Sequence, residues 1–328
     1  MDAAMNLSFD VAEAFGSSEP LQQAAAVFLP EQSENVKAVL ICLPGGSYDK
    51  TYWNMEVPGH RGYSFARHLT EQGFVVVALD HLGIGESADP QMVGQVDAAL
   101  LATGDAAVTA QIRTAVKQGS LAPQLPPQNV PFIGIGHSMG AGIATIVQAE
   151  TSAYDAVALL GWAAEIDVHD KTSDELAEIV KNDETSLATL AARLDQSETE
   201  YRLATATPSH AAYTDLPREG FHGLFYLPDV PPEVIAADAA VASRVPTRAA
   251  AETITPGFIR QYARKIDVPI FLALGEVDVT PAPYAEPAHY PSSHDITLFV
   301  LAGSAHCHNF AGTRTVLWNR LASWAGSV

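Results

Sequence analysis

The sequence Gly-His-Ser-Met-Gly at residues 136–140 constrains the fold of this chain more than any other segment. It follows a short apolar run, residues 132–136, typical of a parallel strand that is buried on both faces. It leads into residues 139–150, whose helical pattern opens with small side chains. A tight strand–turn–helix connection needs glycine where the strand and the helix approach each other, and it strains the backbone of the central serine. The segment predicts that the hydroxyl of Ser138 is held above a helix N-terminus, the geometry of a nucleophile elbow.

The composition indicates a folded globular protein and argues against two kinds of binding partner. The 328 residues are 48% hydrophobic and 17% charged, which indicates a folded globular protein of one domain with an insertion or of two domains. The net charge of −20 argues against nucleic acid and anionic membrane surfaces as partners, because both are bound by clustered lysine and arginine. The same acidity also favours solubility.

The sequence predicts a cytoplasmic protein. No apolar run approaches the length that spans a bilayer. Residues 1–19 contain no lysine or arginine and no long apolar stretch, so a secretory signal is not expected. The two cysteines, Cys42 and Cys307, do not make a disulfide scaffold.

Strands and helices are predicted to alternate along most of the chain. Apolar runs predict strands at residues 24–29, 36–43, 74–80, 132–137, 156–162, 269–274 and 295–301. Helical spacing predicts helices at residues 63–72, 98–117, 139–150 and 314–324. This alternation predicts an α/β fold with a mostly parallel central sheet and helices on both faces.

The alternation is interrupted after Trp162. Residues 163–265 are polar and acidic and then rich in proline, and a structureless loop of this length would be exceptional. Their helical patterns fall at residues 174–194, 232–243 and 256–264. We therefore expect a core domain formed by residues 1–162 and 266–328. Residues 163–265 are expected to form an inserted helical cap over the carboxyl ends of the strands, where open α/β folds place their sites.

Two other predicted strand ends carry partners for Ser138. The strand at 269–274 is followed by Gly-Glu-Val-Asp, which ends at Asp278, and the strand at 295–301 is followed by a short loop that ends at His306. The chain order serine, aspartate, histidine is the order found in hydrolases with a nucleophile elbow.

Neighbouring residues offer alternatives to both partners. Glu276 and Glu165 also follow predicted strands, and His308 lies two residues beyond His306. We favour Asp278 for its place after Leu-Gly-Glu-Val. We favour His306 because its position after Gly-Ser-Ala at the strand end resembles that of the histidine in a known family of hydrolases. A metal site at the two histidines would need a third ligand, and no nearby spacing suggests one.

A second glycine pattern does not indicate a cofactor. Gly83 and Gly85, with Ala88, mimic a dinucleotide-binding fingerprint, but that fingerprint requires a helix directly after the glycines. Pro90 interrupts such a helix. We expect neither a cofactor nor a metal.

The motifs together resemble those of a known family. Besides the elbow, the sequence Asp-His-Leu-Gly-Ile-Gly-Glu-Ser at residues 80–87 follows a predicted strand ahead of it. The chain resembles the α/β-hydrolase superfamily, in particular its cap-bearing serine hydrolases. The resemblance covers residues 36–162 and 268–328 and does not extend to the insertion. His81 and His137, which occupy motif positions, are expected to be hydrogen-bonded structural histidines.

The resemblance implies a role for each site residue. Ser138 would attack an acyl carbon, His306 would accept its proton, and Asp278 would orient the imidazole. Backbone N–H groups of Met139 and Gly46 would bind the oxyanion that forms.

The loop after the strand at 36–43 departs from the family pattern. Relatives often begin this loop with His-Gly, whereas here it begins with Pro44-Gly45. The donor is a backbone N–H group, so the loss of the histidine does not abolish the hole, but Ser47 is an alternative donor to Gly46.

A serine nucleophile excludes the branches of the family that use aspartate, the dehalogenases and epoxide hydrolases. We expect hydrolysis of a small or medium apolar ester or lactone, with Phe225, Tyr226 and Leu227 lining the substrate pocket; these side chains could equally form the cap's own core. Alternatives are thioester hydrolysis, C–C bond hydrolysis, cofactor-free perhydrolysis, and a hydrolase-like binding protein that turns over slowly. The oligomeric state is left open.

Overall fold

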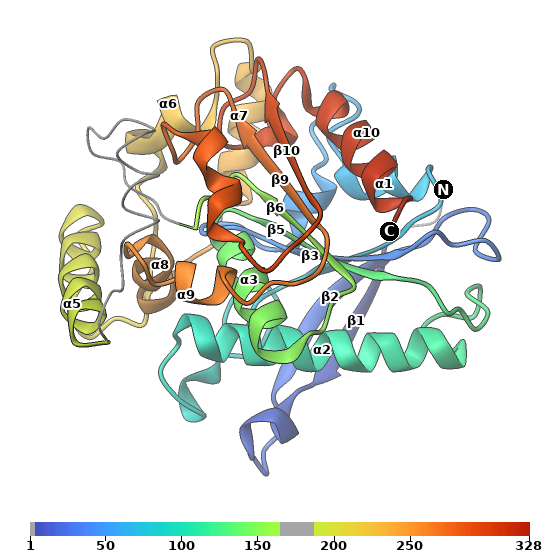
Figure 1. Cartoon of the computed structure of the whole chain (residues 1–328), viewed down its shortest axis with the longest axis horizontal. Coiled ribbons are helices and arrows are strands. Elements are labelled where there is room, and N and C mark those ends of the chain that lie inside the picture. Colours follow the sequence, from blue (N-terminus) through green and yellow to red (C-terminus); the bar gives the residue numbers. More distant parts are fainter. Residues whose placement is uncertain (1–3, 165–186) are drawn as a thin grey trace.

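An eight-stranded sheet forms the centre of the protein, in the order β1-β2-β4-β3-β5-β6-β9-β10 (Figure 1). The computed structural model describes residues 4–164 and 187–328. The strands are β1 (Met5–Asp10), β2 (Gln22–Phe28), β3 (Val39–Leu43), β4 (Val75–Leu79), β5 (Phe132–His137), β6 (Ala156–Leu160), β9 (Ile270–Gly275) and β10 (Ile296–Leu301). Strand β2 pairs antiparallel with β1 and β4, and all other pairs are parallel. The predicted mostly parallel sheet is confirmed.

Helices cover both faces of this sheet (Figure 1). One face carries α1 (Phe65–Thr70) and α10 (Arg314–Ala325), and the other carries α2 (Ala98–Gln118) and α3 (Met139–Thr151). Local signals fix the helix ends. The side chain of Asp97 caps α2 by accepting a hydrogen bond from Leu100, and Gly119 ends it in the left-handed region at φ 68°. Among the described residues, no helix combines the length and apolar character needed to cross a bilayer.

The two faces of the central strands feed two separate apolar cores. In β3, Val39, Ile41 and Leu43 pack in the core beneath α2 and α3, whereas Leu40 and Cys42 pack in the core beneath α1 and α10. This alternation follows from the two-residue period of a strand, and all five side chains are fully buried. Burying a large apolar side chain contributes roughly 1.5–3 kcal/mol, so the sheet is a rigid support for the loops at its strand ends.

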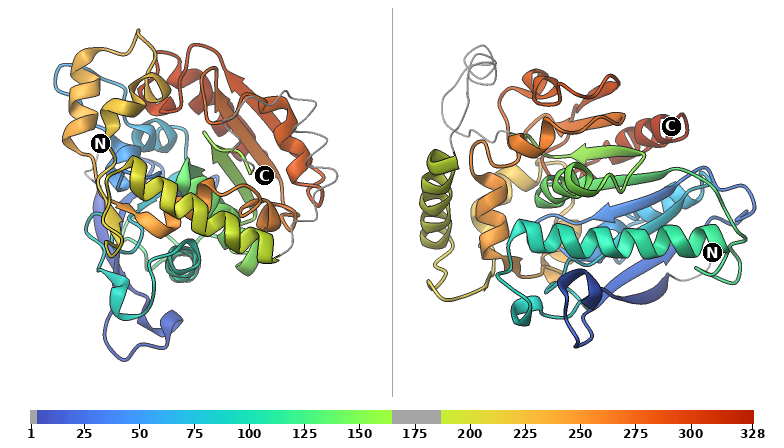
Figure 2. Two further views of the ribbon diagram at one scale, coloured as in Figure 1. Left: turned by 90° about the vertical axis from the view of Figure 1, so that its left-hand side faces the viewer. Right: turned by 60° about the horizontal axis from the view of Figure 1, so that its bottom comes forward.

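The insertion, defined here as residues 187–265, lies between β6 and β9 and is mainly helical. Its elements are α5 (Leu187–Ala204), β7 (Tyr213–Thr214), α6 (His222–Phe225), α7 (Pro232–Ala240), β8 (Val245–Pro246), α8 (Thr247–Ile254) and α9 (Arg260–Ala263). Helix α8 packs on α2 and α3, and α5 lies outside α8 at the periphery (Figure 2). Whether residues 163–265 form a separate domain stays a prediction.

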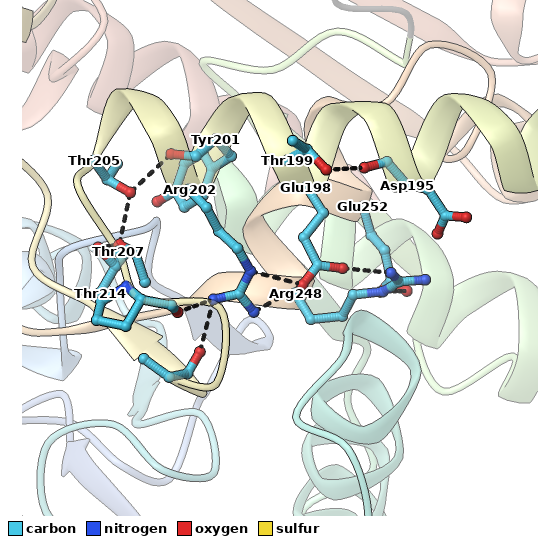
Figure 3. Close-up of polar contacts among 12 residues, drawn as sticks. Asp195, Glu198, Thr199, Tyr201, Arg202, Thr205, Thr207, Thr214, Arg248 and Glu252 are labelled. Atoms are coloured by element: carbon cyan, nitrogen blue, oxygen red, sulfur yellow. Dashed lines mark hydrogen bonds and ion pairs between the residues drawn. The ribbon is translucent and has the colours of Figure 1, made fainter.

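Ion pairs hold α5 to the rest of the insertion (Figure 3). Glu198 on α5 forms two ion pairs. Its Oε2 lies 2.6 Å from Nη1 of Arg248 on α8, and its Oε1 lies 2.8 Å from Nη2 of Arg202 on its own helix. Arg248 also binds Glu252 at 3.0 Å, and Glu252 accepts the backbone N–H of Ala98 at the start of α2. Burial opposes the charge on Glu198, but the two arginines hold its pKa below the ordinary value.

Some predicted elements differ from the structure. The helix expected at 256–264 is reduced to α9, because Gly257 at φ +85° interrupts the helical turn before it. The helix expected at 174–194 falls mostly outside the described residues, and α5 continues well past residue 194. Strand β1 and helix α8 were not predicted, although β1 shows the alternating burial of a strand at the sheet edge.

Candidate active site

Ser138 occupies the turn between β5 and α3. Its backbone has φ 54° and ψ −127°, a region that residues other than glycine rarely adopt. The N–H of Ser138 donates to the carbonyl of Leu160 at 2.9 Å, and its own carbonyl accepts from Ala141 at 2.8 Å. These bonds to a neighbouring strand and to the following helix stabilise the strained conformation that the sequence motif predicts.

The glycines on either side of Ser138 allow close backbone contacts. A Cβ atom on Gly136 would lie 2.3 Å from Cα of Ala141. A Cβ atom on Gly140 would lie 2.4 Å from the carbonyl oxygens of Leu43 and Pro44. Side chains at these two positions would push the helix away from the sheet, so the glycine spacing of the motif has a direct steric cause.

Three strand ends bring together the three residues that the sequence singled out. Ser138 follows β5, Asp278 follows β9, and His306 follows β10. Nε2 of His306 lies 3.0 Å from Oγ of Ser138, and Nδ1 of His306 lies 2.6 Å from Oδ1 of Asp278. The side chains of His306 and Asp278 are 5% and 1% exposed, so the hydrogen bond between them is shielded from water, whereas Ser138 is partly exposed.

Four donors surround the carboxylate of Asp278. The backbone N–H of Gly275 donates to Oδ2 at 2.7 Å and that of Val279 to Oδ1 at 2.8 Å. Nε2 of His308 lies 3.1 Å from Oδ2, opposite the oxygen that receives His306. Burial alone would raise the pKa of Asp278, but the two histidines outweigh it and hold that pKa well below the ordinary value. Asp278 is therefore a fixed negative charge beside His306.

The alternative partners lie elsewhere. Glu276 is exposed, and its Oε2 accepts the backbone N–H of Gly303 at 2.9 Å. His308 is bonded to Asp278 rather than to Ser138. Glu165 falls outside the described residues.

The loop after β3 passes directly beside Ser138. A Cβ atom on Gly45 would lie 2.9 Å from Cβ of Ser138, so glycine is needed for this approach. Within residues 4–164 and 187–328, the backbone N–H groups of Gly46, Ser47 and Met139 donate no hydrogen bond. Met139 is also the first residue of α3, where the helix dipole favours negative charge. The loop after β3 and the start of α3 therefore both offer N–H donors that no described residue engages.

This geometry agrees with a comparison with known families. A family model described as serine aminopeptidase S33 matches residues 60–309. The chain belongs to this family of α/β-hydrolases. A search of curated proteins finds no match.

Solved structures share the fold of this α/β-hydrolase at low sequence identity. A thermophilic esterase from Thermogutta terrifontis has a TM-score of 0.63 at 15% identity, covering 98% of each chain. A soluble variant of monoglyceride lipase from Saccharomyces cerevisiae has a TM-score of 0.63 at 13% identity, covering 100% of this chain and 95% of the lipase. Proline iminopeptidase from Mycobacterium smegmatis has a TM-score of 0.59 at 15% identity, covering 98% of each chain.

Two buried histidines of the hydrolase form hydrogen bonds to the backbone of the loops that carry the site residues. Nε2 of His137 donates to the carbonyl of His306 at 2.9 Å, and burial next to His306 and His308 holds the pKa of His137 well below its ordinary value. His137 is therefore neutral, and it fixes the backbone that carries His306.

His81 performs a similar task for the loop after β3. Its Nε2 lies 3.1 Å from the carbonyl oxygen of Pro44 and its Nδ1 lies 2.8 Å from Asp105. Gln23 donates to the same carboxylate at 2.6 Å. Burial opposes the charge on His81, but Asp105 outweighs it and raises the pKa of His81. The expected hydrogen-bonding role of both histidines is met, whereas the partners Gln23 and Asp105 carried no sequence signal.

The insertion contacts the histidine loop of the hydrolase directly. The N–H groups of His306 and Cys307 donate to the carbonyls of Leu224 and Phe225 at 3.0 and 3.2 Å. The ring centroid of Phe225 lies 5.9 Å from that of His306. Of the three expected lining residues, Phe225 therefore adjoins the site.

The other two expected lining residues lie differently. Tyr226 is buried, and its hydroxyl donates to Asp238 of the insertion. Leu227 is partly buried. Tyr226 and Val230 belong to the apolar core that also contains Phe225 and Phe310, which places them in the contact between the insertion and the sheet domain.

Proposed function

We propose that this protein hydrolyses carboxylic esters through an acyl-enzyme on Ser138. The observation that carries the proposal is the continuous line from Oγ of Ser138 through His306 to Asp278, with separations of 3.0 and 2.6 Å. These are the distances at which an imidazole accepts the proton of a serine hydroxyl while a carboxylate holds the ring.

The chemistry follows from the arrangement. Oγ of Ser138 forms a bond to the acyl carbon as its proton passes to Nε2 of His306, and the negative charge of Asp278 stabilises the imidazolium that results. His306 then gives this proton to the departing alcohol. Water, deprotonated by His306, then attacks the acyl carbon of the acyl-enzyme. The bond from this carbon to Oγ of Ser138 breaks, His306 returns the proton to Oγ, and the acid leaves.

The N–H of Met139 and that of Gly46 or Ser47 stabilise the tetrahedral intermediates. Each such donor typically contributes roughly 10²–10³ in rate, because it points at the oxygen on which charge develops. Within the described part of the chain these N–H groups have no partner, and this supports the assignment, since a donor already engaged in a strong bond would have to break it first.

Two features of the insertion favour an uncharged acyl substrate over a peptide with a free N-terminus. The ring of Phe225 lies against His306 and gives that side of the site an apolar surface. An α-ammonium group is recognised by a carboxylate that is free to pair with it. Among the described residues, Asp238, which lies buried near the loop after β3, has its charge paired with Arg218, and its Oδ2 also accepts hydrogen bonds from the hydroxyls of Tyr48 and Tyr226. A small or medium apolar ester or lactone therefore suits the site best.

A substrate panel tests the proposal. We expect 4-nitrophenyl esters of two to eight carbons to give higher kcat/KM than prolyl or other aminoacyl 4-nitroanilides, thioesters and dienol-diketone compounds. The Ser138→Ala variant is the matched background and should lose ester turnover. A preference for anilides would assign a peptidase, and a preference for diketones would assign C–C bond hydrolysis. A single burst without further turnover on every ester would assign a binding protein.

A further inference from the structure

Arg218 of the insertion reaches into the loop that carries the second candidate oxyanion donor. Its Nη1 donates to Oγ of Ser47 at 3.0 Å and also approaches the Ser47 carbonyl at 3.5 Å. Its Nη2 donates to the hydroxyl of Tyr48 at 2.9 Å, and the guanidinium lies 4.7 Å above the Tyr48 ring. One side chain therefore binds two consecutive residues of the loop directly after Gly46.

The same guanidinium is fixed by the insertion itself. Nη2 of Arg218 also binds the fully buried carboxylate of Asp238 and donates to the hydroxyl of Tyr226 at 3.0 Å. The ring of Phe225, which faces His306, lies 5.3 Å from the guanidinium carbon. Burial opposes the charge on Arg218, but Tyr48 and Asp238 outweigh it and raise its pKa. A planar, permanently charged fork held on several sides is a rigid anchor.

The loop needs such an anchor because its conformation is unfavourable. Ser47 has φ 64°, in the left-handed region that costs a residue with a side chain roughly 1–2 kcal/mol. The Ser47 carbonyl accepts a second bond from the insertion, the N–H of Ser243 at 2.9 Å. Among the described residues, the side-chain and backbone bonds to Ser47 thus come from the insertion, from Arg218 and Ser243.

We propose that Arg218 is a positioning residue through which the insertion completes the oxyanion hole. This inference rests on the proposed function, because it assigns Gly46 or Ser47 as an oxyanion donor. Without Arg218, the loop would relax from its left-handed turn, and the N–H of Gly46 or Ser47 would no longer point at the oxyanion. The ground-state ester, which makes weaker bonds to these donors, would bind nearly as before.

The test compares Arg218→Met with Arg218→Met/Asp238→Asn. Methionine keeps an unbranched apolar chain but has no donor, and the second substitution avoids an unpaired buried carboxylate that could unfold the single variant. Arg248→Met is the matched control, because Arg248 is also a mostly buried arginine of the insertion. Its partners among the described residues are two carboxylates of the insertion, Glu198 and Glu252, rather than residues of the loop. Circular dichroism and thermal unfolding establish that each variant is folded.

Two measurements are made on each folded protein. The first is kcat and KM on a 4-nitrophenyl ester, and the second is the affinity of a trifluoromethyl ketone with the same acyl chain, which forms a tetrahedral adduct with the serine. We expect the double variant to lower kcat by about 10–100-fold with KM within about threefold, and to weaken ketone binding by a similar factor. Arg248→Met should leave both within about threefold.

Several outcomes would overturn the inference. One is a folded double variant that binds the ketone as tightly as the wild type. Another is a rise in KM at unchanged kcat, which would make Arg218 a substrate-binding residue. Equal losses in Arg248→Met would show only a general effect of loosening the insertion. Failure of the proposed function is seen separately, as a lack of ester turnover by the wild-type protein, and the ketone affinities then still decide the role of Arg218.

Discussion

The strand ends and the insertion each carry a cluster of buried or partly buried polar side chains, but the two clusters are built differently. Ser138, Asp278 and His306 each follow a strand of the sheet within a few residues, so the backbone ladder sets their positions. The cluster in the insertion belongs to helices α5 and α8, and its members are held mainly by their ion pairs with one another (Figure 3). These members are Glu198, Arg202, Arg248 and Glu252. Arg218 links the two regions.

If Ser138 is the nucleophile as proposed, the strand ends position the reacting groups, whereas the helices of the insertion position one another. A cluster fixed by a sheet keeps its distances when one member is changed, so the effect of a substitution there appears in the chemical step. A cluster that fixes its own helices loses packing when one member is changed, so the effect appears in stability. Substitutions in each region test this division.

The first prediction concerns the two histidines bonded to Asp278. His306→Ala should lower kcat for ester hydrolysis on the order of 10⁵-fold or more, because it removes the base that touches Ser138. His308→Ala should lower it only about 10–100-fold, the worth of one hydrogen bond to a charged group. His308→Gln, which keeps a donor, should recover most of that loss. A greater loss in His308→Ala than in His306→Ala would reverse the assignment.

The second prediction concerns the acid. Asp278→Asn should lower kcat about 10⁴-fold, because an amide cannot stabilise the imidazolium of His306 and favours the wrong tautomer. Glu276→Gln is the control and should keep near-wild-type kcat, since Glu276 is exposed and bonded to Gly303. Near-normal turnover by Asp278→Asn would redirect the assignment to Glu276 or Glu165.

The third prediction moves to the insertion. Arg248→Met should lower the free energy of unfolding by about 1–3 kcal/mol, because it leaves the partly buried carboxylates of Glu198 and Glu252 without their shared partner. Urea unfolding followed by circular dichroism measures this loss, and kcat on the same preparation measures any effect on chemistry. A large fall in kcat at unchanged stability would break the division between the two regions.

The fourth and smallest effect concerns pH and the buried pair of His81 and Asp105. Because the pKa of His81 is raised in the folded protein, its contribution to stability is complete below the unfolded value of about 6.5 and is lost as the pH rises through the folded value. The wild type should therefore lose more stability between pH 6 and pH 9 than His81→Gln does, by urea unfolding at each pH. An equal loss in the two proteins would show that His81 is neutral in the fold.

Sequence reasoning went furthest where short-range signals fix position. The glycines of residues 136–140 predicted the turn at Ser138, and the strand ends predicted that Asp278 and His306 would meet it. The family model and the sheet confirm the fold that these motifs indicated.

The sequence did not predict two contacts between residues that are distant along the chain. Arg218 meets Ser47 across 171 positions, and His81 meets Asp105 only because α2 packs beside the loop after β4. No periodicity or motif marks either pair, since each depends on how helices dock rather than on local spacing. Strand β1 was not predicted for a different reason: as an antiparallel edge strand it buries one face only, so its residues alternate and lack the continuous apolar run of the central strands.

Covalent labelling tests whether Ser138 is the nucleophile. Wild-type protein treated with a fluorophosphonate should gain the mass of one phosphonyl group, and peptide mass spectrometry should place it on Ser138. Ser138→Ala should gain none, and His306→Ala, which keeps the hydroxyl but lacks its base, should be labelled far more slowly. Labelling of Ser138→Ala at the wild-type rate, or a phosphonyl group on another residue of the wild type, would contradict the central claim that His306 activates Ser138 as the nucleophile.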